Sequence, residues 1–327
     1  LPLYGGGLRW GLSSPLKEGE EWKRFIGLSN PGLKLGQGPR MGLSNFHRKL
    51  LILGRKKKMK INNSFFLIRN LSTYFYAKKE IIKAVDGVTL EVKKGETVGI
   101  AGESGCGKST LARSTLRLVP PPGRIVSGEI LYKRSNILKI NEQQLRNIRG
   151  NKISIIFQDP SIYLNPTVSI GKQICDVIMA HNNVSFKNAR SKTIQLLDEL
   201  EIPEPGDRFK NFPYEFSGGM KQRVLIAMAI SCNPELVIAD EPTTALDVTI
   251  QRQILELIKG KLIKKDSSFL FITHDLSILA EICDRIYIMY AGSIVEQAKA
   301  TDLFQKPLHP YTQKLLAAIP RHDIRKE

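Results

Sequence analysis

One short segment constrains the fold of this chain more than any other. The sequence Gly102-Glu103-Ser104-Gly105-Cys106-Gly107-Lys108-Ser109 fits the pattern GxxxxGK[ST], and it lies between an apolar run at 97–101 and a helical pattern at 109–119. Glycines let consecutive N–H groups turn inward onto phosphate oxygens, and the positive end of the following helix strengthens the attraction. We therefore predict a phosphate-binding loop, with Lys108 on the β- and γ-phosphates and Ser109 on Mg²⁺.

Short apolar runs alternate with helical patterns from residue 61 onward. The predicted strands are 65–69, 88–92, 97–101, 153–157, 236–239, 269–273 and 286–289. The predicted helices are 109–119, 187–201, 218–231, 249–265 and 276–282, and the first of them should end before the prolines at 120–122. Such alternation predicts an α/β fold with a parallel sheet covered on both faces.

Two acids follow the apolar run at 236–239. Parallel strands bring their carboxyl ends to one edge of a sheet, so Asp240 and Glu241 should lie beside the phosphate loop. We expect Asp240 to bind Mg²⁺, directly or through water, and Glu241 to polarise the water that attacks the γ-phosphate. The alternative is that the two acids form a solvated turn.

Gln158 and His274 satisfy the same geometric argument, because each directly follows a predicted strand. Both side chains should therefore face the nucleotide, as candidate catalytic residues, and Gln158 is also a candidate Mg²⁺ ligand. The alternative for His274 is an ordinary position beside a helix N-cap at Asp275.

The basic charge of the chain is concentrated near its N-terminus. The net charge is +18, and residues 1–60 contribute 13 Lys and Arg against 3 Asp and Glu. We expect translation to start at Met59, because the codons for 54–58 could be purine-rich like a bacterial or archaeal ribosome-binding site. Residues 1–58 should then be a non-native or disordered extension; a basic arm and a targeting peptide are the alternatives.

Cysteine spacing and hydropathy narrow the class of protein further. The cysteines show no CxxC spacing, which argues against a zinc site or a disulfide framework and suits a reducing compartment. They are Cys106, Cys175, Cys232 and Cys283. The longest apolar runs, such as 224–230, are far shorter than the roughly 18 residues that span a bilayer. We therefore expect no membrane-spanning helix.

The segment Phe216-Ser217-Gly218-Gly219-Met220-Lys221-Gln222-Arg223 resembles the signature LSGGQ-x-Q-R of ABC-type ATPases, with Phe for Leu and Met for Gln. Together with the phosphate loop and the two acids, it makes residues 61–320 resemble the nucleotide-binding subunits of ABC transporters. The resemblance implies a P-loop NTPase fold over 61–300, with a parallel-sheet core, an antiparallel β subdomain and an α-helical subdomain at about 163–222.

The same resemblance implies roles for single residues. The signature should cover the γ-phosphate of the ATP that is held by the phosphate loop of a second subunit. Asp247 should lie at the interface between the two subunits, and an aromatic side chain should stack on adenine. Phe75 is favoured for the adenine contact, with Tyr74 and Tyr76 as alternatives. The ATP-binding residues implied are Gly102, Glu103, Ser104, Gly105, Cys106, Gly107, Lys108, Ser109, Thr110, Phe75, Ser217, Gly218, Gly219 and Asp247, and those implied for Mg²⁺ are Ser109, Gln158 and Asp240.

Two further segments, 158–166 and 308–312, resemble the oligopeptide and dipeptide importers, whose C-terminal tail would occupy 301–327. This resemblance implies ATP hydrolysis that drives peptide import at the cytoplasmic face of the membrane. The implied partners are a second ATPase, two permease subunits and, indirectly, an extracytoplasmic solute-binding protein.

Other functions stay open at this point. Nickel or oligosaccharides are alternative cargoes, and a subunit that binds ATP without hydrolysing it is an alternative role. An ABC ATPase acting on nucleic acid or ribosomes is the alternative from another class. The stretch between Lys108 and Ser217 is too short for the long coiled coils typical of such proteins, so we expect no nucleic-acid partner.

Overall fold

The computed structural model describes residues 65–77, 80–244, 246–262 and 267–318. The chain divides into two units, Leu1–Met59 and Lys60–Glu327, and every described residue belongs to the second unit. The predictions for 1–58, including the start at Met59, lie outside the described residues, as do residues 319–327 of the predicted tail. Within the described part of the chain, no helix is long and apolar enough to cross a membrane.

The first sheet is antiparallel and has the strand order β2-β1-β4-β5. Its strands are β1 (Phe66–Tyr76), β2 (Ile81–Val92), β4 (Gly123–Tyr132) and β5 (Ser135–Asn136). The predicted strands at 65–69 and 88–92 are thus parts of longer strands, while β4 had no predicted counterpart. Long-range pairing of β1 with β4 stabilises a segment whose own sequence carries little apolar alternation.

The second sheet has the strand order β10-β9-β3-β8-β7-β6, and all its pairs are parallel except β9 with β10. Its strands are β3 (Thr97–Ala101), β6 (Ile153–Ile156), β7 (Leu236–Asp240), β8 (Ser268–Ile272), β9 (Arg285–Tyr290) and β10 (Ser293–Lys299). The parallel-sheet core is therefore confirmed, with one antiparallel edge strand added.

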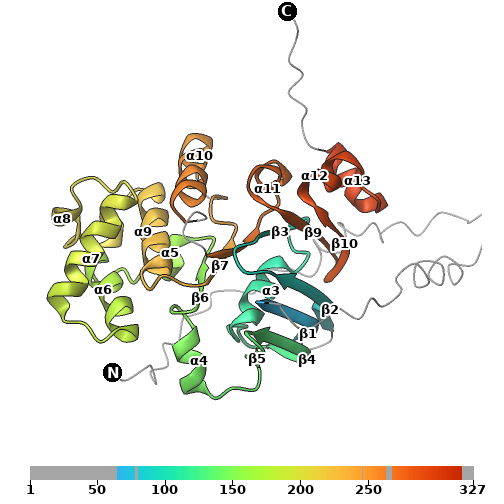
Figure 1. Ribbon diagram of the computed structural model, residues 1–327, viewed down its shortest axis with the longest axis horizontal. Helices are drawn as coiled ribbons and strands as arrows, with labels where there is room; N and C mark the ends of the chain where they lie inside the picture. The colour runs from blue at the N-terminus through green and yellow to red at the C-terminus, as the bar shows by residue number, and fades with distance from the viewer. Residues whose placement is uncertain (1–64, 78–79, 245, 263–266, 319–327) are drawn as a thin grey trace, which may run out of the picture. The chain divides into compact units, whose positions relative to one another are not determined.

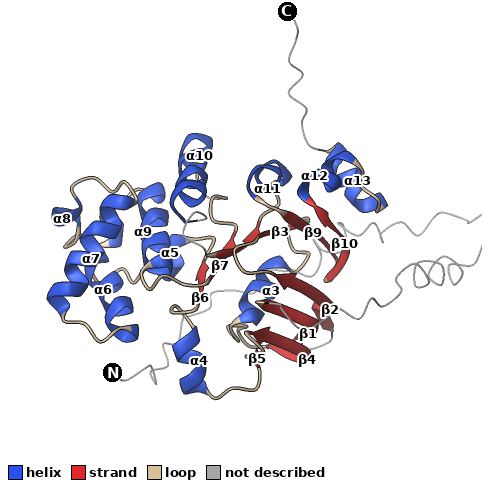
Figure 2. Cartoon of the chain, in the orientation of Figure 1, coloured by secondary structure: helices blue, strands red, loops and turns tan. Residues whose placement is uncertain are grey.

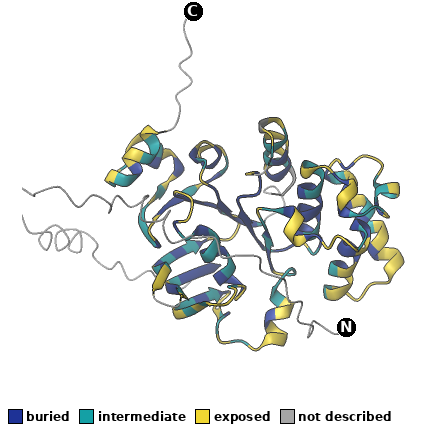
Figure 3. Cartoon of the chain, turned by 180° about the vertical axis from the view of Figure 1, so that it is seen from behind, coloured by how far each residue is buried: buried dark blue, intermediate teal, exposed yellow. Residues whose placement is uncertain are grey.

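Both faces of the second sheet are covered, as Figure 2 shows in outline. In β7, Leu236 and Ile238 pack into a core with the first sheet and helix α3 (Lys108–Thr115). The alternate residues Val237 and Ala239 pack into a second core formed with the helices. Figure 3 shows the strands as buried between exposed outer surfaces. Burial on both faces explains why these strands read as continuous apolar runs.

Most of the remaining helices lie between strands in the sequence, and the last two follow the last strand. They are α4 (Glu142–Ile148), α5 (Pro160–Tyr163), α6 (Ile170–His181), α7 (Phe186–Glu199), α8 (Pro205–Arg208), the 3₁₀ turn η2 (Pro213–Glu215), α9 (Gly218–Ile230), α10 (Val248–Leu257), the π turn η3 (Ile258–Leu262), α11 (Leu276–Ile282), α12 (Ala300–Gln305) and α13 (Pro310–Ala317). Figure 1 shows α6, α7 and α8 gathered beside α9 at one end of the described unit.

The predicted helix at 109–119 is shorter than expected. It ends at Thr115, because Arg117 takes a left-handed conformation with φ 56°. The N–H groups of Arg117 and Leu118 then bond back to the carbonyls of Ser114 and Arg113, which closes the helix. The prediction placed the end at the prolines that follow and was wrong by four residues.

Candidate active site

The phosphate loop is held tightly between β3 and α3. Gly107 caps α3 with φ 108°, a conformation that side chains rarely adopt, and a Cβ there would collide with the carbonyl oxygen of Ala84. A Cβ on Gly102 would collide with the carbonyl oxygen of Met289. Glycine is therefore required where β2 and β9 press against the loop.

Lys108 is the first residue of α3, its side chain reaches back into the loop, and it is only 4% exposed. Its Nζ donates hydrogen bonds to the carbonyl oxygens of Gly102 and Glu103, both at 2.9 Å. The same atom lies 4.0 Å from the Sγ of Cys106 and 3.8 Å from a carboxylate oxygen of Glu241. Burial raises the pKa of the Cys106 thiol, which fits a small filling side chain and not a nucleophile.

A cavity of about 170 Å³ opens in front of the loop. It is lined by Ala84, Ser104, Gly105, Gly107, Lys108, Ser109, Thr110, Gln158 and Glu241. The first N–H groups of α3 have no partners within the helix, so together with Lys108 they make the cavity attractive to anions. Its volume is below that of a typical pocket for a whole small ligand and suits a phosphate chain. Gly102, Glu103 and Cys106 are in the loop but do not line the cavity.

Asp240 ends β7 beside the first turn of α3. Ser109 Oγ donates a hydrogen bond of 2.9 Å to Asp240 Oδ1. Asp240 is 2% exposed, and this burial raises the pKa of its carboxyl group. Ser109 and Gln158 line the cavity, whereas Asp240 lies behind Ser109 and does not line it. A carboxylate, a hydroxyl and an amide are the kinds of hard oxygen donor that fit Mg²⁺.

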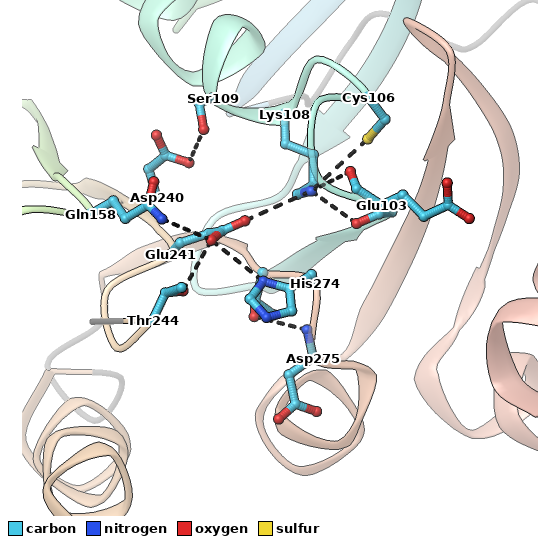
Figure 4. A network of polar contacts seen from close by, with 12 residues as sticks. Glu103, Cys106, Lys108, Ser109, Gln158, Asp240, Glu241, Thr244, His274 and Asp275 are labelled. Carbon is cyan, nitrogen blue, oxygen red and sulfur yellow. Dashed lines mark hydrogen bonds and ion pairs between the residues drawn. The ribbon is translucent and has the colours of Figure 1, made fainter. Parts of the chain in front are cut away.

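Glu241 is the centre of a network of polar contacts, drawn in Figure 4. Its Oε2 accepts hydrogen bonds from Gln158 Nε2 at 3.2 Å and from Thr244 Oγ1 at 3.0 Å, and lies 3.4 Å from His274 Nδ1. The backbone of Glu241 has φ 47°, a strain of about 1–3 kcal/mol for a side chain of this size. Its N–H is fixed by the carbonyl of Ile272 at 2.8 Å.

The structure therefore brings all three predicted catalytic residues together at the Glu241 carboxylate. Gln158, Asp240, Glu241 and His274 come from the ends of three neighbouring strands, as the parallel topology requires. The His274 side chain is half exposed at 52%, whereas that of Glu241 is 11% exposed. An exposed imidazole beside a buried carboxylate can contact a ligand that enters from outside.

The predicted signature residues lie elsewhere. Ser217 caps α9, its Oγ accepting a hydrogen bond of 3.3 Å from Met220 N, and it is exposed. A Cβ on Gly219 would lie 2.6 Å from Ile250 of α10, so α9 begins against the helix that Asp247 caps. Neither Ser217 nor Asp247 lines the phosphate cavity.

The three candidate aromatic residues differ in their surroundings at the end of β1. Tyr74 donates a hydrogen bond of 2.7 Å to Asp86, and the guanidinium of Arg124 lies over the Tyr76 ring. A Cβ on Gly123 would lie 2.7 Å from the Phe75 ring, so this ring packs along β4. Phe75 does not line the phosphate cavity, and its contact with adenine stays a prediction.

Two residues that contact Glu241 or the phosphate loop had no predicted role. One is Thr244, whose hydrogen bond to Glu241 depends on how the loop after β7 turns. Tyr311 accepts a hydrogen bond of 3.2 Å from the backbone N–H of Glu103, across 208 residues of sequence. No local pattern signals either contact.

Two parts of the chain match known protein families. Residues 85–244 match the ABC transporter family, and residues 295–327 match the oligopeptide/dipeptide transporter C-terminal region. The second match begins in β10 and includes α12 and α13.

Known proteins resemble the chain over most of its length. It is 50% identical over 254 residues to the probable peptide ABC transporter ATP-binding protein y4tR of Sinorhizobium fredii, covering 77% of this chain and 76% of that protein. It is 46% identical over 258 residues to the dipeptide transport ATP-binding protein DppD of Bacillus subtilis, covering 79% and 77%.

A solved structure agrees with the fold. It is a dimeric post-hydrolysis state of the ATP-binding cassette MJ0796 bound to ADP and Pi, with a TM-score of 0.65 at 27% identity. The match covers 72% of this chain and 98% of that one. These matches agree with the buried parallel sheet, the phosphate loop and the acids at the end of β7. The chain belongs to the ABC transporter family, among its ATP-binding, ATP-hydrolysing proteins.

Proposed function

We propose that this chain hydrolyses ATP to drive the import of peptides through a membrane transporter. The observation that carries the proposal is the match of residues 295–327 to the C-terminal region of oligopeptide/dipeptide transporters. The relatives named as peptide and dipeptide transport ATP-binding proteins support the same cargo class. They favour peptides over nickel, oligosaccharides or an action on nucleic acid.

The network around Glu241 supports a division of labour in hydrolysis. Thr244 and Gln158 both donate to one carboxylate oxygen of Glu241, and the other oxygen faces Lys108. A carboxylate fixed in this way can accept a proton from water that attacks the γ-phosphate. His274 Nδ1 lies 3.4 Å from the same Glu241 oxygen that Gln158 contacts, and it can orient the water or the phosphate.

Mg²⁺ would be held by Ser109, Asp240 and Gln158. Gln158 donates its amide nitrogen to Glu241, which leaves the amide oxygen available for the metal. When bound, Mg²⁺ would neutralise charge on the β- and γ-phosphates. The buried Asp240 carboxylate would then lie beside a counter-charge.

The exposed signature supports a two-subunit nucleotide site. Ser217 caps α9 and lies outside the cavity of its own chain, and with the N-terminus of that helix it would form an anion-binding surface. In our proposal this surface covers the γ-phosphate on a second ATPase subunit. In the same proposal, the helices between 163 and 222 dock on two permease subunits. The chain would then lie peripherally at the cytoplasmic face of the membrane, with a solute-binding protein on the other side.

Uptake of labelled peptide tests the cargo directly. The chain, its genomic neighbours for permeases and binding protein, and its partner ATPase are expressed in a host that lacks peptide importers. We expect uptake of a radiolabelled tri- or tetrapeptide that is lost in Glu241→Gln. Uptake of nickel or an oligosaccharide, with no peptide uptake, would contradict the proposed cargo and leave the ATPase assignment intact.

A further inference from the structure

The C-terminal helix α13 contacts the phosphate loop. Tyr311 lies in the first turn of α13, and its hydroxyl oxygen accepts the hydrogen bond from the backbone N–H of Glu103. Glu103 is the second residue of the loop motif, directly after Gly102. A segment that matches the oligopeptide/dipeptide transporter region is therefore joined to the nucleotide site of the same chain.

Glu103 is held from two directions. Its N–H donates to Tyr311, and its carbonyl oxygen accepts the hydrogen bond from Lys108 Nζ at 2.9 Å. The carbonyl also accepts a bond of 3.3 Å from the N–H of Cys106, which shapes the loop. Glu103 does not line the cavity, so Tyr311 can influence the nucleotide only through the loop backbone.

The position of Tyr311 is fixed by its own neighbours. The carboxylate of Glu296 in β10 accepts hydrogen bonds from the N–H groups of Leu308 at 2.8 Å and His309 at 3.0 Å. His309 Nδ1 then caps α13 by accepting from the N–H of Tyr311 at 3.1 Å. The Tyr311 ring packs on Tyr290, with ring centroids 4.5 Å apart. These contacts tie α13 to the hairpin of β9 and β10.

We propose that Tyr311 is a positioning residue for ATP binding, which holds the start of the phosphate loop in the conformation that receives the phosphates. A loop that is already ordered loses less conformational freedom when the ligand binds, so docking of α13 raises the affinity for ATP. The inference rests on the ATP-binding part of the proposed function and is independent of the cargo.

Removal of one hydroxyl group tests the proposal. Tyr311→Phe keeps the ring contact with Tyr290 and removes the acceptor for Glu103 N–H. We expect ATP affinity, measured by titration of the full chain, to fall about two- to ten-fold, the range for one intramolecular hydrogen bond. The KM for ATP should rise equally, while kcat at saturating ATP stays within about two-fold, because Lys108, Asp240 and Glu241 are untouched.

Two further variants separate positioning from general stability. Tyr290→Phe is the matched control, since among the described residues the Tyr290 hydroxyl has no hydrogen-bond partner, and it should leave ATP affinity unchanged. His309→Ala removes the cap of α13 and should weaken ATP binding in the same direction. If both side chains act through the docking of α13, the loss of ATP affinity in the double variant Tyr311→Phe/His309→Ala should be smaller than the sum of the losses in the two single variants.

Unchanged ATP affinity in Tyr311→Phe would overturn the inference, and so would a fall in kcat as large as the rise in KM. Fully additive effects in the double variant would also overturn it, because they would separate the hydroxyl contact from helix docking. A wild-type chain that fails to bind ATP would contradict the proposed function itself, which keeps the two failures distinct.

Discussion

Replacement of Glu241 by glutamine tests the assignment of the catalytic base. Glutamine has nearly the same shape as glutamate, so its amide oxygen can still accept hydrogen bonds from Gln158 and Thr244. The change removes the negative charge that lies 3.8 Å from Lys108 Nζ and the group that can accept a proton. Lys108 keeps its carbonyl partners in the loop, so the fold of the site should survive.

The proposed role as general base gives the expected size of the effect. Loss of a general base lowers turnover by roughly 10²–10⁴-fold, which corresponds to about 2.7–5.4 kcal/mol in the activation barrier. ATP binding should stay within about three-fold of the wild type or become tighter, because the Glu241 carboxylate faces the phosphates as a like charge. Turnover and binding should therefore separate in this variant.

Single-turnover hydrolysis and nucleotide titration on the same preparation give the two quantities. Glu281→Gln is the matched control, since it makes the same change on the exposed surface of α11, where Glu281 pairs with Lys259 at 3.0 Å. It should hydrolyse ATP at the wild-type rate. A Glu241→Gln variant that turns over within about three-fold of wild type would refute the assignment of Glu241.

Two other predictions concern the adenine contact and the Mg²⁺ site. Phe75→Ala should weaken ATP binding by about 1–3 kcal/mol, whereas Tyr74→Ala and Tyr76→Ala should not, and equal losses in all three would reject specific stacking on Phe75. Burial raises the pKa of the Asp240 carboxyl group above its value in the unfolded chain, so the folded state binds more protons. The protonated carboxyl group therefore favours folding, and this contribution to the free energy of unfolding is lost as pH rises through the raised pKa. Without metal, the Tm difference between Asp240→Asn and wild type should therefore grow in favour of the variant from pH 4 to pH 8, while Mg²⁺-dependent hydrolysis is lost; a constant Tm difference would contradict this reasoning.

The elements around the site were predictable from the sequence because each carries a local signal. The strands β3, β7 and β8 are buried at every residue and mostly apolar, since both faces of their sheet are covered. The loop from Gly102 to Ser109 needs glycines at fixed places. Once these strands are parallel, the meeting of Gln158, Glu241 and His274 follows from topology.

Features that depend on distant partners were not predictable. Gly123–Tyr132 forms a strand because it pairs with β1, whose partner residues lie 48 to 66 positions earlier. Its partly exposed pattern gives no alternation to detect. Gly128, with φ 103°, interrupts that pattern where β1 and β4 shift register. The contact of Tyr311 with Glu103 depends on the packing of α13 on β10, which no short window of sequence contains.

We propose that a complete ATP site needs two subunits, because Ser217 is exposed and outside the cavity of its own chain. Ser217→Arg would fill the space for a partner's γ-phosphate. Ser185→Arg is the matched control, since Ser185 caps α7 through the same kind of bond, at 3.4 Å from Asn188 N, so both variants lose an N-cap worth about 1 kcal/mol.

The most direct measurement is the rate of ATP hydrolysis as a function of protein concentration, with the chain mixed with its partner ATPase. We predict a rate that rises more than in proportion to concentration, and that falls to the level of the isolated chains in Ser217→Arg but not in Ser185→Arg. ATP binding at the chain's own loop should be the same in all three proteins. Fast hydrolysis by the isolated chain, with a specific rate independent of concentration and unaffected by Ser217→Arg, would contradict the two-subunit site.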